Sequence, residues 1–86
     1  MQIGNPIVST PDELDYLRSL DEELREAIRS SLYSGRSHLA VALDTARDFV
    51  ESVLAEDEPK PTRIALARSR AEIALEVWRE ASNVRH

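Results

Sequence analysis

The sequence predicts an all-α protein, a three-helix up-down-up bundle built from a helical hairpin and a third helix. Apolar residues recur at helical spacing in three segments, and breaks containing Gly35 and the pair Pro59 and Pro61 separate them. We expect helices over about residues 11–34, 37–57 and 62–83. Residues 1–10 are expected to form an extended arm, so that residues 11–86 make up a single helical domain.

The first helix has a complete start signal. Thr10 is placed to cap the helix, Pro11 suits its first position, and Glu13 can reach back to the amide of Thr10. Beyond this start, apolar residues from Leu14 to Leu32 fall on about one half of the helix, and charged residues cover the other half. The segment is therefore expected to be an amphipathic helix on the surface of the bundle.

The second helix should follow the first almost at once and run antiparallel to it. Gly35 is expected to end the first helix in a left-handed conformation, and Ser34 or Ser37 to start the next one. The apolar stripe from Leu39 to Leu54 then faces the first helix. We expect the helix to end near Glu56 or Asp57, with a frayed last turn, because acidic residues oppose the helix dipole there.

The third helix, for which Thr62 is the expected cap, has the widest apolar face. Its apolar residues span about 200° of the helix circumference, which is more than two neighbouring helices need to cover. Part of this face is therefore expected to bind another copy of the chain or a target protein. On this ground we expect the bundle to dimerise into a larger one.

Composition excludes several classes of protein. The chain has 86 residues and no Cys, so it has neither disulfides nor thiolate metal sites. A net charge of −5 argues against nucleic acid as a partner. No apolar run is long enough to span a membrane, and residues 1–10 lack a secretion signal, so we expect a cytoplasmic protein without a membrane partner. The charge is uneven, and the acidic residues 1–59 could attract the basic residues 60–86.

Arg70 is the single charge within the apolar face of the third helix. A buried guanidinium is costly unless it is paired, so we expect Arg70 to extend its head to the edge of the face, to pair with an acid such as Asp21 or Asp48, or to bind a partner or an anion. Trp78 is expected to pack in the core or to anchor an interface. The predicted partner-binding residues are Arg70, Ala74, Val77, Trp78 and Ala81.

No catalytic, cofactor or metal site is predicted. His38 lacks the Glu three residues earlier that a helical metal site requires, and its ring is expected to pack at a helix edge. The acidic clusters could hold Mg²⁺ between helices, but a solvated face is favoured because four of their residues project to the solvent side: Glu22, Glu26, Asp44 and Glu51. On the exposed side of the third helix, a ladder of ion pairs is expected among Arg68, Glu72, Glu76, Arg79 and Glu80.

Two classes of function remain. The first is a non-catalytic interaction module, such as a regulator, adaptor, inhibitor or chaperone-like protein, that binds a protein partner through the third helix and the Ile3–Val8 arm, with a homodimer as the first expectation. The alternative is a small helical-bundle enzyme in which Arg70, with Arg36 or Arg63, holds an anion at a dimer interface. A third reading, weak DNA binding by a dimer, would require joined basic faces.

Overall fold

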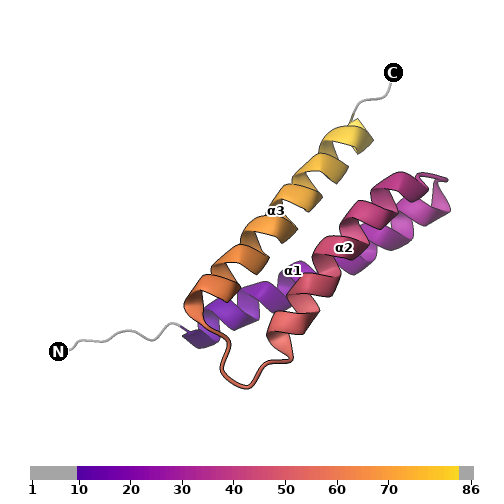
Figure 1. The fold of residues 1–86 in the computed structure, drawn as a ribbon. Helices are drawn as coiled ribbons and strands as arrows, with labels where there is room; N and C mark the ends of the chain where they lie inside the picture. The colour runs from indigo at the N-terminus through magenta and orange to yellow at the C-terminus, as the bar shows by residue number, and fades with distance from the viewer. Residues whose placement is uncertain (1–9, 84–86) are drawn as a thin grey trace.

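The computed structural model describes residues 10–83 of the chain, and the side chains of residues 13–82. It contains three helices: α1 (Thr10–Tyr33), α2 (Ser37–Leu54) and α3 (Pro61–Asn83). Successive helices run in opposite directions (Figure 1), as the up-down-up prediction requires. Thr10 belongs to α1 and not to the predicted arm. The rest of that arm, with its predicted binding role, and the capping by the Thr10 side chain lie outside the described residues.

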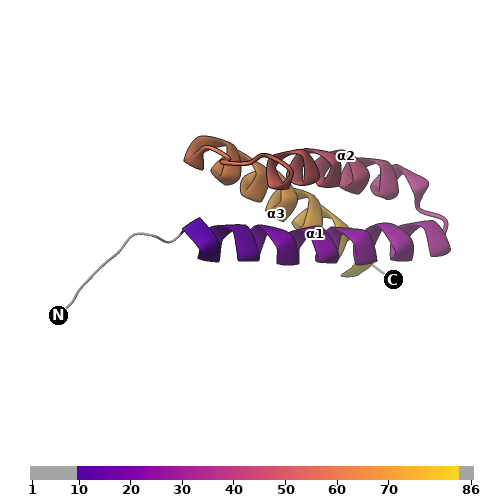
Figure 2. The same cartoon turned by 90° about the horizontal axis from the view of Figure 1, so that it is seen from below.

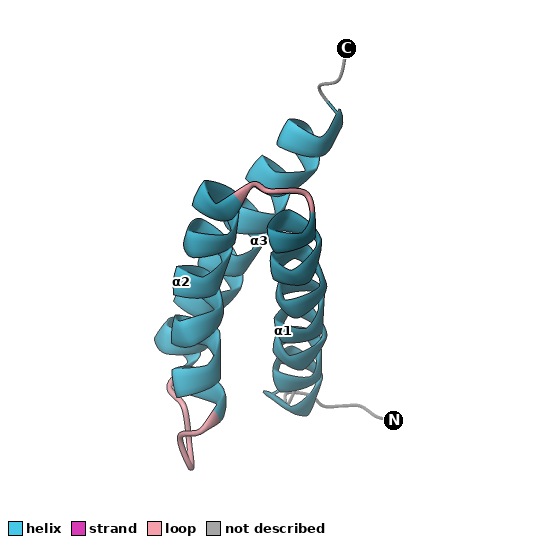
Figure 3. Ribbon diagram, turned by 90° about the vertical axis from the view of Figure 1, so that its right-hand side faces the viewer, coloured by secondary structure: helices cyan, strands magenta, loops and turns pink. Residues whose placement is uncertain are grey.

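The hairpin of α1 and α2 forms one layer, and α3 crosses it. Figure 3 shows α1 and α2 side by side with α3 behind them. Figure 2 shows that α3 starts beside the end of α2 and passes diagonally toward α1. Each pair of helices is in contact. In the described part of the chain, the helices lack the combination of length and apolar character that crossing a bilayer demands.

The joint between α1 and α2 confirms the predicted role of Gly35, which has φ +78°. The amide of Gly35 donates to the carbonyl of Leu32 at 3.2 Å, and that of Arg36 to the carbonyl of Ser31 at 2.7 Å. These two bonds are those of a Schellman motif, which satisfies carbonyls at the helix end. α2 starts at Ser37, one of the two serines predicted to start it, and Arg36 before it makes no capping bond with its side chain in the described part of the chain.

The second joint differs from the prediction at both ends. α2 ends at Leu54, short of Glu56 and Asp57, as expected if carboxylates at this end destabilise the last turn. α3 starts one residue before the predicted cap, since Pro61 is its first residue and the carbonyl of Lys60 accepts a bond from the amide of Ile64. Proline suits this position because it has no amide hydrogen left to satisfy there.

Leucine, valine and alanine form the core between the three helices. Leu17 and Leu24 from α1, Leu43 and Val50 from α2, and Leu75 from α3 are at most 1% exposed. On α3, alanines make up half of the residues that pack in this core: Ala67, Ala71 and Ala74, beside Ile64, Leu75 and Trp78. Phe49 and Trp78 are only partly buried and pack at the border of this core.

Polar side chains tie α3 to α1. Arg79 pairs with Glu23 at 3.1 Å, and Tyr16 donates its hydroxyl to Glu72 at 2.6 Å. The carboxylate that accepts this bond raises the pKa of Tyr16. The predicted ladder is wrong, because no ion pair among the described residues joins two positions of α3. The Arg79–Glu23 pair instead shows the attraction expected between the basic end and the acidic start of the chain.

Ser31 is a polar residue enclosed by the core. Ser31 is only 1% exposed, and its Oγ has no hydrogen-bond partner among the residues that the structure describes. A buried hydroxyl without a partner loses its hydration and gains nothing in exchange. We expect Ser31→Ala to raise the free energy of unfolding by about 1 kcal/mol, measured by urea denaturation. Ser30→Ala, at an exposed neighbouring position, is the control, and an equal or lower stability of Ser31→Ala would contradict this account.

Candidate functional site

An apolar groove of about 390 Å³ lies between the first half of α2 and the second half of α3. It forms there because α3 crosses the hairpin diagonally and moves away from α2 as it approaches α1 (Figure 2). The residues that line it are Leu39, Ala42, Leu43, Thr45, Ala46, Arg70, Ile73, Ala74, Val77 and Trp78. Apart from Arg70 and Thr45, every one of these side chains is apolar. The groove therefore offers a surface suited to apolar side chains rather than to a charged ligand.

One wall of the groove continues into exposed apolar residues on the outer side of α3, and we call this set the α3 strip: Leu66, Ile73 and Val77. Leu66 is 45% exposed, Ile73 60% and Val77 49%. The apolar face of α3 is thus divided into a half that packs against the hairpin and a half that remains uncovered. This division accounts for the apolar arc of about 200° that the sequence predicts around the circumference of this helix. A cluster of this kind is typical of an interaction surface.

Arg70 borders both the groove and the α3 strip, and it is exposed rather than buried. Its guanidinium carbon lies 5.1 Å from the centre of the Phe49 ring, and that of Arg63 lies 5.4 Å from the same centre. The predicted ion pair of Arg70 with Asp21 or Asp48 is absent from the described residues. The helical projection placed Arg70 among apolar residues correctly, but its long side chain lets the charge reach solvent above an aromatic face.

Four of the five predicted partner-binding residues meet at the groove: Arg70, Ala74, Val77 and Trp78. Ala81 is half-buried one turn further on, and its carbonyl accepts a bond of 3.0 Å from Nη1 of Arg36. The prediction omitted Ile73, whose spacing from Arg70 and Val77 already indicated this side of the helix. It also omitted the α2 wall, because periodicity within one helix carries no information about which neighbour lies beside it.

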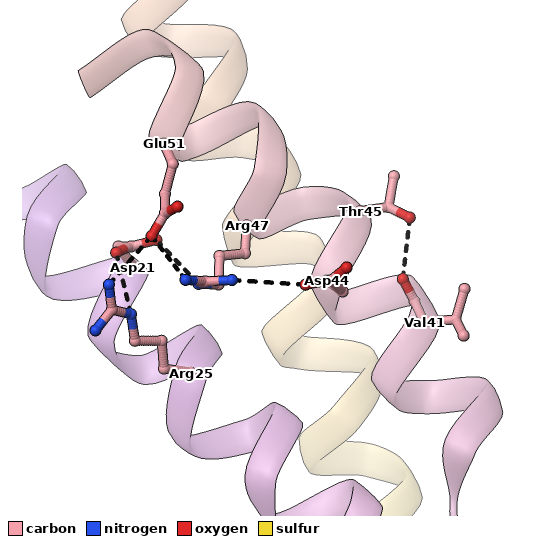
Figure 4. Close-up of polar contacts among 7 residues, drawn as sticks. All are labelled: Asp21, Arg25, Val41, Asp44, Thr45, Arg47 and Glu51. Carbon is pink, nitrogen blue, oxygen red and sulfur yellow. Dashed lines mark hydrogen bonds and ion pairs between the residues drawn. The ribbon is translucent and has the colours of Figure 1, made fainter. Parts of the chain in front are cut away.

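Away from the groove, α1 and α2 are joined by a cluster of charges (Figure 4). Asp21 of α1 is only 8% exposed. It lies 3.8 Å from Arg47 and 3.7 Å from Arg25, and Glu51 binds the same two arginines at 3.0 Å and 3.3 Å. The sequence prediction assigned Glu51 to the solvent side. In the structure it is half-buried, because arginines from both helices draw it toward Asp21.

The two carboxyl groups of this cluster have pKa values displaced in opposite directions. Burial raises the pKa of Asp21, and the neighbouring negative charge of Glu51 adds to this effect. Partial burial also disfavours the charged form of Glu51, but hydrogen bonding to Arg25 and the charge of Arg47 outweigh it and lower the pKa of Glu51. The charges of Arg25 and Arg47 act to lower the pKa of both carboxyl groups, which is typical of a structural ion-pair network.

The other predicted candidates are dispersed. His38 is exposed, and the packing of its ring at a helix edge stays a prediction. Of the arginines considered for an anion site, Arg36 binds the carbonyl of Ala81, and Arg63 pairs with Glu56 at 2.6 Å. Within the part of the chain that the structure describes, no group of three or more His, Asp or Glu side chains could hold a metal ion.

The groove and the α3 strip thus form one continuous apolar surface that the described part of the bundle leaves unpartnered. Comparisons with models of known protein families, with curated proteins and with solved structures found no match for the chain. The chemistry of this surface, with apolar side chains at its centre and charges at its edges, is therefore the basis for a functional proposal.

Proposed function

We propose that the chain is a non-catalytic protein-interaction module that binds its partner through the α3 strip and the adjoining groove. The observation that carries the proposal is the exposure of Leu66, Ile73 and Val77 along one side of a helix whose other side is buried. Because apolar surface is driven out of water, a partner that covers these side chains gains about 25 cal/mol for each Å² buried.

The border of this surface is suited to protein recognition. Trp78 is half-buried at the groove, and Arg70 lines the same groove about two turns earlier on α3. Trp and Arg are enriched among the residues that dominate binding energy at protein interfaces. A regulator, adaptor, inhibitor or chaperone-like protein needs only such a surface and a stable scaffold beneath it.

Ile73→Lys tests this proposal, with Leu32→Lys as its control. Both residues are large, apolar and mostly exposed, but Leu32 lies near the end of α1 and does not line the groove. We expect Ile73→Lys to weaken association at least a hundredfold, whether with another copy or with a second protein, because a charge would be buried at the interface. Leu32→Lys should bind as the native chain does.

The measurement combines molar mass in solution with affinity capture from the source cell, and thermal unfolding checks that both variants remain folded. The proposal requires an association that Ile73→Lys removes and Leu32→Lys retains. If Ile73→Lys preserves every association of the native chain, the α3 strip is not the binding surface and the proposal fails.

A further inference from the structure

We infer that the partner covering the α3 strip is a second copy of this chain, with the two α3 helices antiparallel. This inference rests on the proposed function and specifies its partner. It starts from five exposed residues that recur along one side of α3: Leu66, Arg70, Ile73, Val77 and Glu80. Their spacings alternate between four and three residues. That repeat forms a seam along one side of a helix and is the pattern by which two helices pair.

The charges on this seam are placed symmetrically about its centre. Arg70 comes three residues before Ile73, and Glu80 three residues after Val77. A two-fold axis level with Leu75 would bring Ile73 of one copy against Val77 of the other. The same axis would bring Arg70 of one copy against Glu80 of the other, at both ends of the apolar centre. Apolar residues then meet apolar residues, and each charge meets its opposite.

The charges also distinguish this arrangement from a parallel one. In a parallel pair each residue faces its own equivalent, so Arg70 would face Arg70 and Glu80 would face Glu80, and both contacts are repulsive. Neither Arg70 nor Glu80 forms an ion pair with another residue in the described part of the chain, so their charges are not already neutralised by such a pair. Charge complementarity therefore favours the antiparallel pair.

The groove completes the interface. Ile73 and Val77 form its α3 wall, and Ala42 and Thr45 of α2 lie across from them. An α3 helix of a second copy, laid along the seam, would place its own Ile73 and Val77 at the mouth of this groove. Each copy would contribute the strip that the other covers, as a two-fold interface requires.

Charge exchange tests the inference. We expect the native chain to dimerise across a concentration series in sedimentation equilibrium. Arg70→Glu and Glu80→Arg should each weaken the dimer about tenfold or more, because each places like charges together at two symmetric sites. The chain that carries both changes restores opposite charges and should dimerise nearly as the native chain does. Arg68→Glu changes the same charge on α3 outside the seam and is the matched control.

Each outcome is decisive. Recovery in the double variant also shows that Arg70→Glu does not act by unfolding the chain. A native chain that stays monomeric up to millimolar concentration overturns self-pairing, and the proposed function survives if another protein binds in a manner that depends on Ile73. A dimer that tolerates Arg70→Glu and Glu80→Arg overturns the antiparallel register. In a parallel pair each change replaces one repulsion between like charges with another, so the dimer would not weaken further.

Discussion

Leu24→Ala is expected to lower the free energy of unfolding by about 3 kcal/mol, the largest effect of any change considered for this bundle. Leu24 is fully buried in α1 and belongs to the core that all three helices share. Its truncation removes apolar contacts and leaves a cavity that helices fixed by short joints cannot close. Because a domain of this size has only a few kcal/mol of stability, much of it would be lost.

Urea denaturation and thermal unfolding measure this effect, and a fall in Tm of about 10 °C or more is expected. Leu32→Ala is the matched control, since it makes the same change in the same helix at a residue that is 59% exposed. We expect its effect to be below about 0.5 kcal/mol. Equal losses in the two variants would mean that the core does not lie where the structure places it.

Much of the fold follows from local rules about helix starts and ends, and the residues that these rules require can be recognised in the sequence. The stop at Gly35 could be predicted because a left-handed conformation is open to glycine at little cost. The start of α3 was misplaced by one residue, since both Pro61 and Thr62 suit a helix start and sequence alone does not rank them. α2 ends earlier than predicted. Carboxylates weaken the last turn of a helix but do not fix the residue at which the helix ends, so this boundary cannot be predicted to the residue from the sequence.

The candidate site was predictable on α3 and not beyond it. Periodicity showed that α3 has more apolar surface than a three-helix bundle covers, and this surface is now seen at Ile73 and Val77. The partners of charged residues were not predictable, because long side chains reach across helices. Arg79 pairs with Glu23 instead of Glu76, and Arg70 lies over Phe49.

Arg47→Met is expected to lower the free energy of unfolding by about 1–2 kcal/mol near neutral pH. Methionine keeps the apolar stem of the side chain but removes the charge that lies between Asp21 and Glu51. The two carboxylates then repel each other with Arg25 alone to compensate. Arg29→Met is the control, because the exposed pair of Arg29 with Glu26 should contribute little.

The dependence of this loss on pH identifies its cause. In the native chain the raised pKa of Asp21 means that its ionised form destabilises the folded state at pH values above the folded pKa. This destabilisation disappears as the pH falls and Asp21 gains a proton. The lowered pKa of Glu51 has the opposite sign, because its stabilising contribution is lost as the pH falls through its folded pKa. The two effects partly cancel, so the native cluster should give only a weak dependence in acid.

Without Arg47 that cancellation ends, because the pKa values of both carboxyl groups rise in the folded state. The destabilisation by Arg47→Met should therefore be largest near neutral pH and shrink as the pH falls toward about 4, where the carboxyl groups gain protons. Asp21→Asn combined with Arg47→Met should be more stable at neutral pH than Arg47→Met alone, since a neutral amide replaces the buried charge. A loss that is constant across pH, with no rescue by Asp21→Asn, would assign the role of Arg47 to packing of its stem instead of its charge.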